Sequence, residues 1–166
     1  MKRILVLRHA KSDWAAEFGE DRDRPLASRG RAAAQTIGRY LQRIDEVPDR
    51  VISSPAVRAV TTVELAKEHG DWTCPVELEP DFYGGDSGAL LTRLQRSDDA
   101  EHAILLVGHE PTCSEFVGRM IGGARVRFPT AALARIDCDV PCWSEVDYDV
   151  GRLIWQVVPR ALEAFG

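Results

Sequence analysis

Two short, continuous runs of apolar residues constrain the fold of this chain most strongly. Ile4–Leu7 and Ala103–Val107 contain no polar residue. Runs of this length are typical of strands that are buried on both faces, as in a parallel sheet covered by helices. Arg8 and His9 directly follow the first run, and His109 comes two residues after the second. Because α/β proteins bind ligands beyond the carboxyl ends of their strands, we expect these polar residues to share one crevice.

The rest of the chain alternates between helical and strand patterns. Apolar residues recur at helical spacing between residues 33 and 44, 59 and 66, and 111 and 121. Residues 133–138 and 152–158 alternate like strands and predict a late antiparallel pair. The chain of 166 residues suits a single domain over 1–166. We therefore predict an α/β three-layer α/β/α sandwich with a mixed, mostly parallel central sheet.

A third strand end supplies another arginine. Residues 51–52 predict a brief strand, after which Ser54 is the expected N-cap of a helix and Pro55 its first residue. Arg58 would then lie about one turn into the helix. Its side chain leans back toward the N-terminus of the helix, where free backbone N–H groups also favour an anion.

Two histidines and two arginines at strand ends suit the handling of a phosphoryl group. An arginine side chain offers a planar fork of donors that matches two phosphate oxygens. We expect the positive charges of Arg8 and Arg58 to keep the imidazole of His9 neutral, and a neutral ring nitrogen is a competent nucleophile. His109 would donate a hydrogen bond to the phosphoryl oxygens. No metal or organic cofactor is expected, since the arginines would take the place that a magnesium ion often fills.

Several motifs, in this order along the chain, resemble those of the histidine phosphatase superfamily, which has the phosphoglycerate mutase-like fold. They are Leu7-Arg8-His9-Ala10-Lys11-Ser12, Arg24-Pro25-Leu26 with Gly30, Ser53-Ser54-Pro55 with Arg58-Ala59, and Val107-Gly108-His109. The short length and the R-H-A-K-S form are most similar to the SixA-type phosphohistidine phosphatases. Ala10 stands where the family usually has glycine. The resemblance implies a phosphohistidine intermediate on His9, with Arg8, Arg58 and His109 completing the phosphate pocket.

The acid that would protonate the leaving group is not settled by the sequence. Larger members of the superfamily supply a glutamate or aspartate, and here Glu79, Asp81 and Glu110 are the candidates, none of which matches cleanly. An alkoxide leaving group needs such an acid, whereas a phosphorylated imidazole is a better leaving group and needs less help. The ambiguity favours a phosphoramidate substrate.

The segment that follows His9 is polar and irregular. Ser12 either contacts the phosphate or shapes the loop, and Trp14 either lines the entrance or packs. We expect residues 22–24, Arg-Asp-Arg, to form a solvated loop with local ion pairs.

Composition excludes several classes of function. The net charge of -5 argues against nucleic-acid or anionic-membrane partners. The four cysteines lack the paired spacing of a zinc site, so free thiols are expected. The first apolar run is too short for an export signal, which indicates a cytoplasmic protein.

The sequence thus predicts a cytoplasmic, metal-independent phosphatase that removes phosphate from a phosphohistidine on a partner protein. A chain of this length has little room for a lid, and an open site can admit a protein loop. One alternative is a phosphatase of the same superfamily for a small phosphomonoester. The other is a non-catalytic module that recognises phosphorylated partners.

Overall fold

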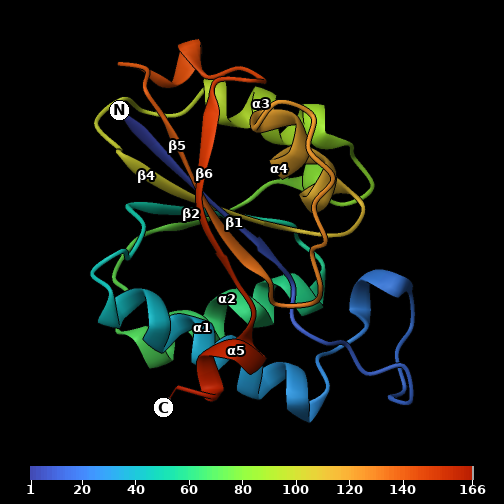
Figure 1. Ribbon diagram of the computed structural model, residues 1–166. Helices are drawn as coiled ribbons and strands as arrows, with labels where there is room; N and C mark the ends of the chain where they lie inside the picture. Colours follow the sequence, from blue (N-terminus) through green and yellow to red (C-terminus); the bar gives the residue numbers. More distant parts are fainter. Residues whose placement is uncertain (166) are drawn as a thin grey trace.

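The computed structural model describes residues 1–165 and confirms the mixed sheet covered by helices on both faces (Figure 1). The six strands are arranged in the order β3-β2-β4-β1-β5-β6. The first four in this order run parallel, and β5 is antiparallel to both β1 and β6, as predicted for the late pair. The strands are β1 (Lys2–Arg8), β2 (Arg50–Ser53), β3 (Val76–Leu78), β4 (Ala103–Gly108), β5 (Leu133–Cys138) and β6 (Gly151–Val157).

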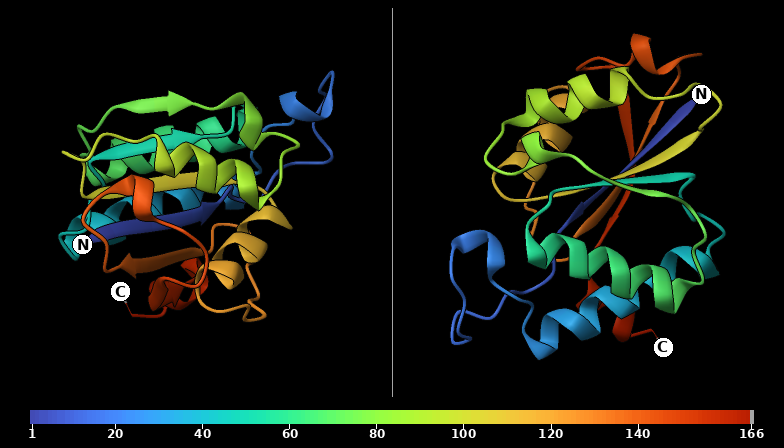
Figure 2. Two further views of the ribbon diagram at one scale, coloured as in Figure 1. Left: turned by 90° about the horizontal axis from the view of Figure 1, so that it is seen from above. Right: turned by 180° about the vertical axis from the view of Figure 1, so that it is seen from behind.

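The helices form the two outer layers (Figures 1 and 2). On one face lie α1 (Ser28–Arg43), α2 (Val57–Gly70) and the short α5 (Pro159–Glu163), and on the other lie α3 (Ser87–Gln95) and α4 (Thr112–Met120). Three single 3-10 turns interrupt the loops: η1 (Asp21–Asp23), η2 (Pro80–Phe82) and η3 (Trp143–Glu145). The long loop that contains η1 projects beyond the end of β1 (Figure 2).

The central position of β1 explains its unbroken apolar run. Ile4 and Val6 pack in the core beneath α3 and α4, whereas Leu5 and Leu7 pack in the core beneath α1 and α2. All of them are fully buried. Since successive side chains of a strand point to opposite faces, a strand covered on both faces needs apolar residues at every position.

The predicted start of α2 was wrong. The helix begins at Val57 with Ala56 as its N-cap residue, so Pro55 lies in the preceding turn. The hydroxyl of Ser54 accepts a hydrogen bond from the backbone N–H of Ala56 at 3.2 Å, but it does not cap the helix. Arg58 is consequently the second residue of α2, even closer to the positive end of the helix than expected.

Glycines of α1 allow two close backbone approaches. A Cβ atom at Gly38 would lie 2.1 Å from the carbonyl oxygen of Ala66 in α2. A Cβ atom at Gly30 would lie 2.1 Å from the carbonyl oxygen of Lys11, two residues after His9. The first contact brings α1 and α2 together, and the second holds the loop after β1 against the start of α1.

We expect Gly38→Ala to lower the free energy of unfolding by about 2 kcal/mol, because the methyl group would overpack the contact between the two helices. The effect would oppose the helix propensity of alanine, which favours the substitution by about 1 kcal/mol. Urea denaturation measures the change. Arg31→Ala, at an exposed position of the same helix, serves as the control and should change the value by less than about 0.5 kcal/mol. A Gly38→Ala protein as stable as the wild type would contradict the close packing.

Candidate active site

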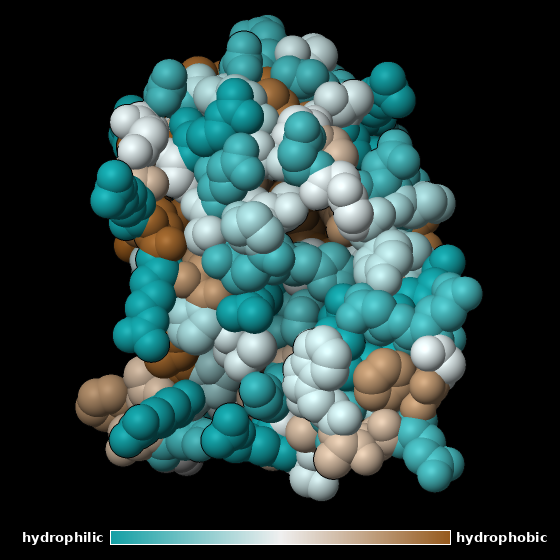
Figure 3. Space-filling view, turned by 90° about the vertical axis from the view of Figure 1, so that its right-hand side faces the viewer, coloured by the Kyte–Doolittle hydropathy of each residue, from teal (hydrophilic) through white to brown (hydrophobic). Residues whose placement is uncertain are grey.

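The residues predicted from the strand ends converge at the carboxyl edge of the parallel strands. Arg8 ends β1 and His9 follows it, Arg58 lies in the first turn of α2, and His109 follows β4. They line one cavity of about 230 Å³. Its other lining residues are Lys11, Ser12, Trp14, Arg24, Glu110 and Thr130. The face of the molecule toward which β1 runs is covered mainly by hydrophilic side chains (Figure 3).

The ring of His9 is held in one tautomer. Its Nδ1 lies 2.7 Å from the carbonyl oxygen of Ala10, so Nδ1 carries the proton and donates it to that oxygen. The other nitrogen, Nε2, therefore keeps its lone pair. Burial lowers the pKa of His9 to about 3, the Ala10 carbonyl opposes this shift, and the charges of Arg58 and Arg8 add to it. The imidazole is neutral as predicted, but burial contributes more to this than the arginines do.

His109 lies beside His9, with the ring centroids 5.1 Å apart. Its Nε2 lies 2.7 Å from the hydroxyl oxygen of Ser54, and its Nδ1 is buried without a hydrogen-bond partner among the described residues. Burial lowers the pKa of His109 to about 4. When Ser54 donates its proton to Nε2, the ring proton lies on Nδ1, where it can be donated to an oxyanion.

Both predicted arginines also have an unused donor. Arg8 donates through Nη1 to the carbonyl oxygen of Phe128 at 3.1 Å, and Arg58 donates through Nη1 to the carbonyl oxygen of Asp21 at 2.8 Å. In each arginine the Nε atom is buried without a partner among residues 1–165. A buried donor without a partner costs about 1–3 kcal/mol. Together with Nδ1 of His109, the two Nε atoms form a set of buried nitrogens without a hydrogen-bond partner among the described residues.

The structure adds a third arginine and corrects the prediction for residues 22–24. Arg24 is only 5% exposed, and its Nε donates to the hydroxyl oxygen of Ser12 at 3.0 Å. Its guanidinium lies 3.6 Å from the ring centroid of Trp14, which is itself 68% exposed. Ser12 thus lines the cavity and also orients Arg24. The motif that begins at Arg24 was the sequence signal for this residue.

Asp21 and Tyr83 also belong to the site, although sequence reasoning missed both. The carboxylate of Asp21 pairs with Arg24, accepts from Arg58 Nη2 at 3.0 Å and accepts from the hydroxyl of Tyr83 at 2.9 Å. The hydrogen bonds from Arg24 and Tyr83 hold the pKa of Asp21 well below its usual range, and the contact with Asp21 raises the pKa of Tyr83. Arg58 lies 37 residues from Asp21 in the chain, and Tyr83 lies 62 residues from it.

The three candidate proton donors are separated by the structure. Glu110 lines the cavity that contains His9, and its Oε1 accepts from the backbone N–H of Ser114 at 2.7 Å. Glu79 accepts from the backbone N–H of Asp81 at 3.2 Å, and both line a different cavity, of about 170 Å³. Of the three, Glu110 alone therefore shares a cavity with His9.

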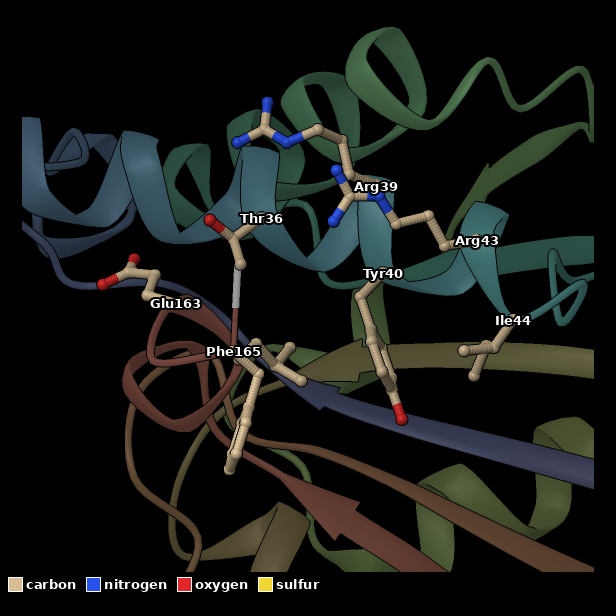
Figure 4. Close-up of a pocket in the computed structure, with 8 residues that line it drawn as sticks. Thr36, Arg39, Tyr40, Arg43, Ile44, Glu163 and Phe165 are labelled. Carbon is tan, nitrogen blue, oxygen red and sulfur yellow. The ribbon is translucent and has the colours of Figure 1, made fainter.

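A larger cavity, of about 410 Å³, lies between α1 and α5 (Figure 4). Its described lining holds no histidine or cysteine, and it consists of Thr36, Arg39, Tyr40, Arg43, Ile44, Leu162, Glu163 and Phe165. Among its described lining residues it therefore has arginines, but no histidine to act as a nucleophile beside them. Within residues 1–165, no helix has both the length and the apolar character needed to cross a membrane.

Comparisons with known proteins establish the family. The sequence model of the histidine phosphatase superfamily (branch 1) matches residues 4–103. The chain is 31% identical over 164 residues to the protein Rv1276c of Mycobacterium tuberculosis, a match that covers 93% of this chain and all of that protein. It is 24% identical over 164 residues to the phosphohistidine phosphatase SixA of Escherichia coli, which covers 97% of this chain and 96% of SixA.

The fold agrees with these matches. A solved structure of the protein histidine phosphatase SixA complexed with tungstate superimposes with a TM-score of 0.84. It has 23% sequence identity and covers 96% of this chain and 99% of that chain. The chain thus belongs to the histidine phosphatase superfamily, and its fold is phosphoglycerate mutase-like, as the motifs implied. The family and the site define a phosphatase.

The lowered pKa values predict an acid-sensitive stability. Below its ordinary pKa of about 6.5, each of these histidines is protonated in the unfolded chain, whereas in the folded protein His9 stays neutral down to about pH 3 and His109 down to about pH 4. The unfolded state then binds more protons, so the stability that the two rings contribute is present above about pH 6.5 and is lost as the pH falls below it.

We expect His9→Gln to reduce the slope of unfolding free energy against pH by about 1.4 kcal/mol per unit between about pH 6 and pH 5. Urea denaturation at several pH values measures the slope, and equal slopes in both proteins would contradict the buried neutral state.

Proposed function

We propose that this protein is a metal-independent phosphatase that forms a covalent phosphohistidine intermediate on His9. The observation that carries the proposal is the hydrogen bond between Nδ1 of His9 and the carbonyl of Ala10, because it leaves Nε2 with its lone pair for the substrate. The low pKa keeps this nitrogen unprotonated at neutral pH. Unpartnered nitrogens of Arg8, Arg58 and His109 supply the donors that a phosphoryl group needs.

The proposed reaction has two steps: transfer of the phosphoryl group to His9, and hydrolysis of the phosphohistidine. Nε2 of His9 forms a bond to phosphorus while the bond from phosphorus to the leaving nitrogen or oxygen breaks, and the leaving atom takes the electron pair. The donors of Arg8, Arg58 and His109 hold the three outer oxygens, over which the transition-state charge is spread. Water then attacks phosphorus, the P–N bond breaks, and its electron pair returns to Nε2. We propose that Glu110, which lines the cavity, protonates the leaving atom and then accepts a proton from the attacking water.

The substrate that we propose is a phosphohistidine on a partner protein. An imidazole leaving group needs less protonation than an alkoxide, and one carboxylate oxygen of Glu110 is already engaged by the amide of Ser114. The exposed Trp14 leaves the rim of the cavity open to a protein loop. SixA of Escherichia coli, a relative over nearly the whole chain, is a phosphohistidine phosphatase, and the SixA structure holds tungstate, a tetrahedral oxyanion like phosphate. We further propose a cytoplasmic location, with neither nucleic acid nor membrane as a partner.

Glu110 also supports a second candidate. Since this carboxyl group lines the cavity, it offers the acid that a phosphomonoester would require. Comparing kcat/KM on a phosphohistidine peptide with kcat/KM on sugar and nucleotide phosphates separates the two functions. We expect the peptide to be preferred by at least about tenfold, and Glu110→Gln to slow a phosphomonoester far more than the peptide. Faster turnover of a small phosphomonoester would reject the protein substrate.

Labelling tests the covalent intermediate directly. We expect a phosphohistidine peptide labelled on phosphorus to transfer an acid-labile label to the wild type, trapped by rapid quenching at neutral to alkaline pH, and none to His9→Gln. His102→Gln, which changes an exposed histidine remote from the cavity, should keep the label. A protein that binds phosphate but never carries the label would instead be a non-catalytic recognition module.

A further inference from the structure

Asp21 places a negative charge among the arginines of an anion site. Its carboxylate pairs with Arg24 and Arg58, and its backbone carbonyl accepts from Nη1 of Arg58 at 2.8 Å. The hydroxyl of Tyr83 donates a further hydrogen bond to this carboxylate, at 2.9 Å. No step of the phosphoryl transfer described above uses this carboxylate. Its hydrogen bonds keep it ionised, so it cannot serve as the proton donor.

The position of this charge conflicts with tight anion binding. Arg8, Arg24 and Arg58 all line the cavity; Arg24 and Arg58 are buried and Arg8 is half-buried. A phosphate dianion among three guanidinium groups, two of them shielded from water, would be held strongly. The product of the hydrolysis is inorganic phosphate, the same anion that the donors hold during the reaction. A phosphatase with such a site must still release it.

We propose that Asp21 weakens the binding of inorganic phosphate and so sets the rate at which the product leaves; this inference rests on the proposed phosphatase function. The carboxylate acts in two ways. It occupies hydrogen-bond donors of Arg24 and Arg58 that a phosphate oxygen would otherwise take, and its charge repels the dianion.

The local structure allows Asp21 to act without disturbing the core. Asp21 belongs to η1, a single 3-10 turn that contains no buried residue, and its side chain is 49% exposed. The turn lies in the loop that projects beyond β1 (Figure 2). The carboxylate can therefore retain or loosen its contacts with the arginines as phosphate enters and leaves, while the strands and helices stay in place.

Calorimetric titration with inorganic phosphate tests the proposal without requiring turnover. We expect Asp21→Asn, which keeps the shape of the side chain and removes its charge, to bind phosphate at least about tenfold more tightly than the wild type. Asp21→Glu keeps the charge and should bind like the wild type to within about threefold. The matched control is Asp23→Asn, which removes the same charge from the same turn. Asp23 accepts from the backbone N–H of Glu20 at 3.1 Å and contacts no arginine of the cavity. It should change the affinity by less than about twofold.

Kinetics supply a second readout. At saturating substrate, Asp21→Asn should turn over more slowly and be inhibited by lower concentrations of inorganic phosphate, with a burst of released leaving group before the slow steady state. A merely structural defect would weaken phosphate binding and give no such burst. Asp21→Ala should show the same gain in affinity, so the test does not depend on one variant being folded.

Equal or weaker phosphate binding by both neutral variants would overturn the role of Asp21 and leave the proposed function intact. A wild type that acquires no label on His9 from the phosphohistidine peptide would instead overturn the proposed function, and this inference with it.

Discussion

The parallel pairing of β1 with β4 is the constraint on which the rest of this site depends. Leu7 is paired with Val107 and Arg8 with Gly108, and the register continues beyond the strands in a hydrogen bond from the N–H of His9 to the carbonyl of Gly108 at 3.0 Å. A shift of one residue would turn every side chain of β1 to the opposite face of the sheet. Because both strands are buried on both faces, the register is held by the core, and the two histidine rings meet as a result.

Burial then sets the protonation state of the two histidines. An exposed histidine is partly protonated near neutral pH, whereas loss of hydration keeps His9 and His109 neutral. The arginines beside them carry a permanent positive charge, because a guanidinium group keeps its proton in proteins. The same environment thus holds neutral imidazoles beside permanent positive charge. A nucleophile and its oxyanion donors can coexist there without a proton passing between them.

Two carboxylates, those of Glu110 and Asp21, lie at this pocket and come from different segments of the chain. Glu110 follows His109 directly in the chain and comes to the cavity with it, whereas Asp21 reaches the arginines from the loop that follows β1. Among the described residues, one oxygen of Glu110 accepts from the backbone N–H of Ser114 and the other has no hydrogen-bond partner. Both oxygens of Asp21 are bound, by Arg24, Arg58 and Tyr83. These different surroundings are the basis for the two roles proposed above, proton transfer for Glu110 and control of anion affinity for Asp21.

The sequence by itself determined the buried strands, their ends and the residues placed on them, while the strand order came from the tertiary structure. Apolar runs identify buried strands, and side chains next to such a run must lie at the edge of the sheet, so Arg8, His9 and His109 could be placed from local pattern alone. Only the tertiary structure decided that Asp21 and Tyr83 join them, because loop contacts across 37 and 62 residues leave no periodic signal in the chain. The start of α2 was likewise decided by packing, since the hydroxyl of Ser54 contacts His109 and the helix begins beyond Pro55. Local pattern reports burial along an element, whereas the partner of a polar side chain depends on how separate elements meet.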